Sequence, residues 1–158
     1  MALEIERKFL LANEDWRPAA THSETLWQGY LTTNERCSVR VRVAGDLGYL
    51  NIKSTTLGVV RHEFEYAVPV AEARELLTLF CDGRSLGKTR YHVPVGAHLW
   101  EIDVFEGENA GLIVAEVELS AEDEEFERPS WLGEEVSADP RYYNTSLIAH
   151  PYARWARS

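Results

Sequence analysis

Pairs of like-charged residues, spaced two apart, are the residues of this chain that could do chemistry. Glu4 and Glu6 open the series, Lys8 follows them, and similar pairs recur along the chain. Residues two apart in a β-strand point to the same side, so each pair presents like charges on one face. Carboxylate oxygens suit Mg²⁺ and Mn²⁺, whereas arginine and lysine bind phosphate oxygens. The pattern therefore predicts a site for a divalent cation together with a phosphate-rich anion.

The two signs of charge occupy different segments. The acidic pairs are Glu4 with Glu6, Glu63 with Glu65, Glu101 with Asp103 and Glu116 with Glu118, and the basic residues are Arg40 with Arg42, Lys88 with Arg90, and Lys53 alone. A solvated sheet face would more naturally mix signs within a strand, because like charges side by side repel. We therefore expect the charged faces to line a wide, wet lumen and the aliphatic faces to point outward.

Alternation of polar and apolar residues supplies the strands that must hold these pairs. The expected strands span residues 3–11, 24–32, 37–43, 47–54, 60–68, 85–93, 99–106 and 112–119. Turn residues make the connections short, which favours antiparallel pairing. Eight strands with few helices predict a mainly β (α+β) fold, an antiparallel barrel that forms a tunnel, because closure removes unpaired strand edges.

Helices are expected at a few places outside the barrel. Apolar residues at helical spacing predict a helix over 70–80 with one apolar face. Ser120 is a candidate N-cap for a short acidic helix, and Asp139 followed by Pro140 predicts another helical start. A last helix is expected over 144–155, bent or stopped near Pro151. With no repeat or linker, residues 1–158 are interpreted as a single domain.

Composition argues against several classes of partner. The net charge of −10 disfavours nucleic acid and anionic membranes. No stretch approaches the roughly 18 apolar residues of a membrane helix, and the N-terminus has no secretory core, so we expect a cytoplasmic location. Cys37 and Cys81 are interpreted as free thiols. The histidines have no ligand spacing and are interpreted as structural or exposed; they are His22, His62, His92, His98 and His150.

The charged segments also resemble, in their order, the CYTH or triphosphate tunnel metalloenzyme family. The matching motifs include Glu4-Ile5-Glu6-Arg7-Lys8, Gln28-Gly29-Tyr30-Leu31, Val39-Arg40-Val41-Arg42, Asn51-Ile52-Lys53, Lys88-Thr89-Arg90-Tyr91, Trp100-Glu101-Ile102-Asp103 and Ala115-Glu116-Val117-Glu118. The resemblance covers nearly the whole chain. It implies an eight-stranded antiparallel tunnel and Mg²⁺- or Mn²⁺-dependent chemistry on a small-molecule triphosphate, of the compact bacterial inorganic triphosphatase kind.

The resemblance also implies roles by position. The metal ligands would be Glu4, Glu6, Asp103, Glu116 and Glu118, and the phosphate-binding residues would be Lys8, Arg40, Arg42, Lys53, Lys88 and Arg90. The catalytic candidates are Lys53 with Tyr30, and the carboxylates Glu63 and Glu65. A lysine base must be neutral, and neighbouring cations would lower its pKa. The alternative for Lys53 is phosphate binding without base chemistry.

The expected reaction is hydrolysis of the terminal phosphoanhydride of inorganic tripolyphosphate. The chain leaves little sequence for a nucleoside or vitamin pocket, which favours a compact substrate. The alternatives are an adenylate cyclase that converts ATP to cyclic AMP and pyrophosphate, a thiamine triphosphatase, and a non-catalytic module that binds polyphosphate or nucleotides. The physiological substrate, the preferred metal and the oligomeric state, a homodimer included, are left open.

Overall fold

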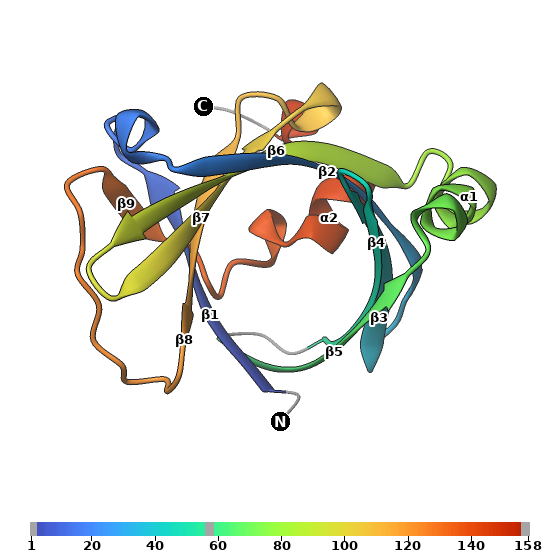
Figure 1. Ribbon diagram of the computed structural model, residues 1–158, viewed down its shortest axis with the longest axis horizontal. Coiled ribbons are helices and arrows are strands. Elements are labelled where there is room, and N and C mark those ends of the chain that lie inside the picture. Colours follow the sequence, from blue (N-terminus) through green and yellow to red (C-terminus); the bar gives the residue numbers. More distant parts are fainter. Residues whose placement is uncertain (1–2, 56–58, 156–158) are drawn as a thin grey trace.

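Antiparallel strands form most of the molecule (Figure 1). The computed structural model describes residues 3–55 and 59–155, and this part of the chain contains nine strands. They are β1 (Leu3–Leu11), β2 (His22–Thr33), β3 (Cys37–Ala44), β4 (Leu47–Ser54), β5 (Val60–Val68), β6 (Ser85–Val95), β7 (His98–Phe105), β8 (Ile113–Leu119) and β9 (Leu132–Glu135). The eight predicted strands are confirmed, with ends that move by at most two residues, and β9 was not predicted.

Eight of these strands close into a barrel. Their order is β5-β4-β3-β2-β6-β7-β8-β1, and pairing of β1 with β5 joins the two ends. Within that joint Glu4 lies opposite Arg61 and Ile5 opposite Val60. β9 pairs with the far end of β1, where Leu11 lies opposite Leu132. The antiparallel barrel predicted from the sequence is therefore confirmed, and β9 extends its wall beside β1.

The main hydrophobic core lies outside the barrel wall. Phe9, Trp100 and Ile102 point outward from their strands and have no exposed surface. They pack against Trp16 and Trp131, which come from segments beyond the strand ends. The apolar faces of the strands thus point away from the lumen, as the alternation predicted. Burial of these faces leaves the inward faces free for polar side chains.

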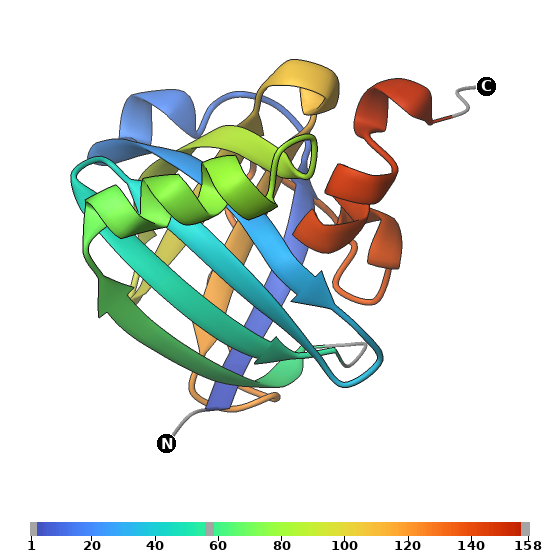
Figure 2. The same cartoon turned by 90° about the vertical axis from the view of Figure 1, so that its right-hand side faces the viewer.

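Helix α1 (Val70–Phe80) covers the outside of β2, β3 and β4 (Figure 2), as predicted. Its buried residues Ala73 and Leu77 pack against Val41 and Val43 of β3.

No helix among residues 3–55 and 59–155 is long and apolar enough to cross a membrane.

The predicted acidic helix at Ser120 is wrong. The segment after β8 forms a turn and irregular structure up to β9. The Glu124 carboxylate accepts a hydrogen bond from the Ser120 N–H at 2.5 Å and also bonds His98. These side-chain contacts compete with a helical backbone, and Phe126 draws the segment onto the outer core.

The C-terminal segment begins as predicted and then crosses one mouth of the barrel. Asp139 accepts a hydrogen bond from the Arg141 N–H and caps the 3₁₀-helix Pro140–Tyr142. Helix α2 (Asn144–Ala149) follows and stops before Pro151, after which residues Tyr152–Arg154 form a further 3₁₀-turn. Figures 1 and 2 show α2 across the end of the barrel, whereas α1 lies against the outside of the barrel wall. A few helices packed outside were expected, and α2 instead closes over a mouth.

Apolar contacts hold this segment in the mouth. Tyr142 and Leu147 belong to a buried cluster with Leu86, Phe105 and Val114 of the barrel wall. The end of the lumen beneath α2 is therefore apolar, in contrast to the charged region beyond it.

Gly29 is required where α1 approaches the barrel. A Cβ atom on Gly29 would lie 2.7 Å from Cys81 Cβ and 3.1 Å from Leu77 Cδ2. We predict that Gly29→Ala lowers the free energy of unfolding by about 1–3 kcal/mol, because the helix must shift. Urea denaturation measures this change.

Gly87→Ala is the matched control on the neighbouring strand. Its added Cβ would meet the end of the flexible Glu106 side chain at 3.1 Å, so we expect a change within about 0.5 kcal/mol. Equal effects of the two substitutions would contradict the close approach of α1.

Candidate functional site

A cavity of about 720 Å³ occupies the interior of the barrel. Its lining includes all but one of the residues predicted for the site: Glu4, Glu6, Lys8, Tyr30, Arg40, Arg42, Lys53, Glu63, Glu65, Lys88, Arg90, Glu116 and Glu118. Asp103 is the exception. The strand parity thus brings residues from both ends of the sequence to one lumen.

The acidic half of the lumen lies on β1 and β8. Antiparallel pairing sets Glu6 opposite Glu118 and Lys8 opposite Glu116. Burial raises the pKa of Glu6 well above its ordinary value, and the charges of Glu116 and Glu4 raise it further. Glu6 therefore gives up its proton less readily than an ordinary glutamate does.

Glu116 shows the complementary behaviour. Burial acts to raise its pKa, but Lys8, Arg90 and a hydrogen bond with Glu6 hold that pKa well below the ordinary value. The pKa values of this neighbouring pair are thus shifted in opposite directions, upward for Glu6 and downward for Glu116. Crowded carboxylates short of positive charge fit a hard divalent cation, which takes oxygen ligands.

Lys53 lies among carboxylates. Its Nζ is 3.0 Å from Glu4 Oε1 and 3.5 Å from Glu63 Oε2. Burial acts to lower the pKa of Lys53, but the charges of Glu6 and Glu4 outweigh it and the pKa is raised. Arg40 acts to lower this pKa, as expected of a neighbouring cation, but the acidic groups outweigh it. Lys53 is positively charged in this arrangement.

The basic half of the lumen lies on β3 and β6. Burial lowers the pKa of Arg42 to about 9, and the charges of Arg40 and Arg90 add to the effect. Burial also lowers the pKa of Lys88 to about 7, although Asp103 opposes this. The Arg40 Nε atom is buried without a hydrogen-bond partner in the described part of the chain. These neighbouring cations, together with the unpartnered Arg40 N–H, are groups that could bind an anion with several charges.

Asp103 lies behind the basic residues. It has no exposed surface and accepts hydrogen bonds from Arg90 Nε at 2.8 Å and Arg90 Nη2 at 3.0 Å. Lys88 Nζ lies 2.6 Å from Asp103 Oδ2, the oxygen that also accepts from Arg90 Nη2. Burial acts to raise the pKa of Asp103, but these two cations lower it to about 2. Asp103 thus does not line the cavity, whereas the other predicted metal ligands do.

Two amide side chains that had no predicted role connect the basic half to α2. Arg42 Nε donates to Gln28 Oε1 at 2.8 Å, and Gln28 Nε2 donates to Asn144 Oδ1 at 3.2 Å. Lys88 Nζ donates to the same Asn144 oxygen at 3.0 Å. Gln28 shares the inward parity of Tyr30 on β2, a signal that the sequence does contain. Asn144 lies in a helix, so no strand parity could have identified it.

A third amide orients the acidic pair of β5. Asn51 Nδ2 donates to Glu63 Oε2 at 3.1 Å and to Glu65 Oε2 at 3.2 Å. Arg40 Nη2 also lies 3.5 Å from Glu65. Asn51 shares the inward face of β4 with Lys53, so parity could have identified it too. The amide bridges two like charges that would otherwise repel.

Comparisons with known proteins agree with this architecture. The family model of the CYTH domain matches residues 2–152. A protein of Acetivibrio thermocellus named inorganic triphosphatase is 43% identical over 152 residues, which cover 96% of this chain and 97% of that protein. One of Nitrosomonas europaea with the same name is 40% identical over 149 residues, covering 91% and 95%.

A solved structure supports the same assignment. The crystal structure of an inorganic triphosphatase is 38% identical and covers 92% of this chain and 97% of that chain, with a TM-score of 0.66. The family match spans nearly the whole chain. The chain therefore belongs to the CYTH domain family.

Proposed function

We propose that this protein hydrolyses the terminal phosphoanhydride bond of inorganic tripolyphosphate inside its barrel, with Mg²⁺ or Mn²⁺ as cofactor. The observation that carries the proposal is the arrangement of one cavity into a carboxylate half and a cationic half. Relatives named inorganic triphosphatase, 40% and 43% identical over nearly the whole chain, support the choice of substrate. The cyclase, thiamine triphosphatase and non-catalytic alternatives have no comparable support.

The divalent ion would be held by Glu4, Glu6, Glu116 and Glu118. The raised pKa of Glu6 beside Glu116 and Glu4 fits this assignment, because crowded carboxylates favour a bound cation. When bound, such an ion neutralises phosphate charge and polarises the phosphoryl group.

The basic half would bind and orient the phosphate chain. Arg40, Arg42, Lys88 and Arg90 project from two strands, and Lys8 adds a cation beside Glu116. Charge-assisted hydrogen bonds from these groups hold the phosphate oxygens and stabilise the charge that accumulates on the leaving diphosphate. Such groups need no reorganisation during the reaction, because the barrel already fixes them.

We assign the attacking water to Glu63 and Glu65. Burial acts to raise the pKa of Glu63, but Lys53 and the Asn51 hydrogen bond lower it, so the group stays ionised and can accept a hydrogen bond from water. Lys53 is protonated, which favours phosphate binding over base chemistry. Tyr30 projects from β2 into the cavity, where its side chain would contact the phosphate chain or the attacking water.

The central prediction concerns phosphate release from tripolyphosphate. Release should require Mg²⁺ or Mn²⁺, and Glu6→Gln or Glu118→Gln should lower it by about 100-fold or more, because ion binding depends on the carboxylates. Glu75→Gln on the exposed face of α1 is the control and should leave release unchanged. Parallel assays with ATP, thiamine triphosphate and pyrophosphate, each with identification of the products, compare tripolyphosphate with the alternative substrates. Undiminished release by Glu6→Gln, or cyclic AMP as the main product of ATP, would overturn the proposal.

Lys53 offers a second test, of charge against base chemistry. Lys53→Met should lower kcat by about 10²–10³, because a cation is lost from the site. Lys53→Arg should retain kcat to within about 10-fold, because it keeps the charge but cannot act as a base at accessible pH. A Lys53→Arg enzyme as inactive as Lys53→Met, with the alkaline limb of the pH profile lost, would favour a base.

Asp103 is proposed to position Lys88 and Arg90 rather than to bind the metal. Asp103→Asn should lower the free energy of unfolding by about 3 kcal/mol, because two buried cations lose their anion. Glu101→Gln, which affects only the more exposed Arg90 contact at 3.2 Å, should cost about 1 kcal/mol or less. Both changes are measured by urea denaturation.

Mg²⁺ titration separates this positioning role from ligation. Asp103→Asn should bind Mg²⁺ as the unaltered protein does, whereas Glu6→Gln should not. Loss of Mg²⁺ binding in a folded Asp103→Asn protein would instead indicate that Asp103 is a metal ligand.

A further inference from the structure

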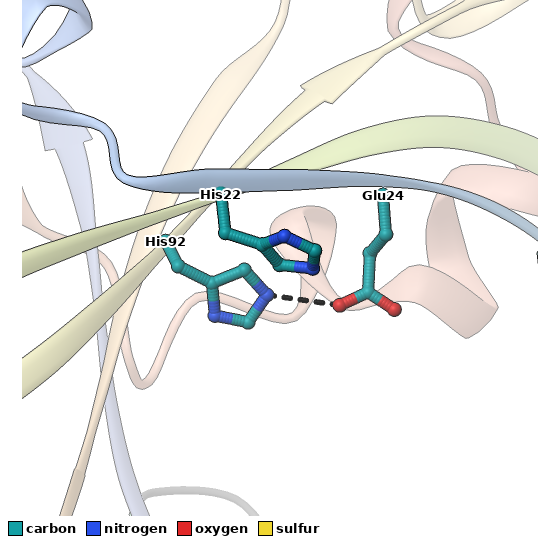
Figure 3. Close-up of side chains that lie close together, drawn as sticks. All are labelled: His22, Glu24 and His92. Atoms are coloured by element: carbon teal, nitrogen blue, oxygen red, sulfur yellow. Dashed lines mark hydrogen bonds and ion pairs between the residues drawn. The ribbon is translucent and has the colours of Figure 1, made fainter.

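Two histidines and a glutamate lie close together on the inner face of the barrel, on strands β2 and β6 (Figure 3). His22 and Glu24 share the inward face of β2, and His92 lies on β6 directly opposite His22. On β6 the inward face includes Leu86, which packs with the α2 cluster, and continues to His92. These three side chains therefore lie toward the end of the barrel opposite α2.

The three donor groups are close enough to share one ion. One ligand atom from each residue lies within 4.8 Å of the others. His92 Nε2 is 2.9 Å from Glu24 Oε2, and the imidazole centroids of His22 and His92 are 5.1 Å apart. Tetrahedral ligation at about 2.1 Å sets ligand atoms about 3.4 Å apart. His22 is exposed, so rotation of its side chain can close the difference.

The donor set selects a different class of ion from the acidic half of the lumen. Imidazole nitrogen suits Zn²⁺, Co²⁺ and Ni²⁺, whereas Mg²⁺ and Mn²⁺ favour sites made of oxygen alone. Two imidazoles with a carboxylate recur as a transition-metal ligand set that leaves coordination positions open.

The local charges also leave Glu24 free to take a cation. Arg90 lies opposite Glu24 in the strand pairing, but its guanidinium bonds Asp103 and Glu101. In the described ranges, Glu24 has its hydrogen bond and ion pair with His92 alone. Each of the three side chains offers one ligand atom, and these atoms lie close enough together to bind a single metal ion.

We propose that His22, Glu24 and His92 form a second metal site, specific for Zn²⁺ and related transition-metal ions. Glu24 also lines the central cavity, so the open coordination positions of the ion face the lumen. The site does not rest on the proposed hydrolysis, since neither histidine has a part in it. Its sequence signal was hidden because His22 and His92 become neighbours only through strand pairing.

The test is Zn²⁺ binding to the full chain in excess Mg²⁺, which occupies the acidic half of the lumen. Calorimetry should show one Zn²⁺ per chain, and His22→Gln or His92→Gln should weaken binding by about 100-fold. Co²⁺ provides a second readout, because its visible spectrum reports nitrogen ligation. The exposed His62, which lies on β5, supplies the control: His62→Gln should bind Zn²⁺ unchanged.

The variants also distinguish the two metal sites. Glu6→Gln should keep Zn²⁺ binding, because it alters only the acidic half. His22 is exposed, so His22→Gln is expected to fold normally, and circular dichroism checks this. Unchanged Zn²⁺ affinity in folded His22→Gln, no Zn²⁺ binding by the unaltered protein in excess Mg²⁺, or loss of binding in Glu6→Gln alone would each overturn the site.

Discussion

Burial of like charges side by side is the constraint on which the rest of this structure depends. Glu6 keeps a raised pKa beside Glu116, and Arg42 a lowered one beside Arg40 and Arg90. Removal of charges from water costs several kcal/mol per ion, so neither half would be tolerable without compensation. Cross-strand pairs such as Lys8 with Glu116 and Lys53 with Glu4 supply part of it. The remaining imbalance is of the kind that a metal and a phosphate chain relieve together.

A charged lumen also dictates where the hydrophobic core must lie. Since the inward faces are polar, stabilisation has to come from the outward faces, and these need covers. Trp16 and Trp131 cover one side of the barrel, while α1 covers another and approaches β2 so closely that only glycine fits at Gly29. The segments between strands therefore support the site indirectly. They bury the outward apolar faces of the strands, and this burial stabilises the barrel that holds the charged lumen.

Period-two alternation was enough to predict the barrel and the residues of its lumen, because it fixes which side of a strand each residue faces. Alternation alone could not show which inward-facing side chains reach the cavity and which lie behind others. Asp103 and Glu101 share a face, yet Asp103 lies behind Arg90 while Glu101 reaches the cavity. The neighbours of Lys53 come from β1 and β5, so its raised pKa follows from tertiary pairing. β9 escaped prediction because its four residues are too few to establish an alternation.

The inward face of β6 shows how one strand can organise the chemistry of the lumen. Leu86 joins the apolar cluster under α2, Lys88 and Arg90 form the basic row, and His92 meets His22 and Glu24. Along this face, with increasing distance from the closed mouth, the side chains change from apolar to basic to imidazole. Asp103 on β7 and Asn144 in α2 both contact Lys88 Nζ, so the basic row is fixed both by the barrel wall and by the segment that crosses its mouth. The position of α2 is therefore coupled to the basic half of the lumen through both Lys88 and Gln28.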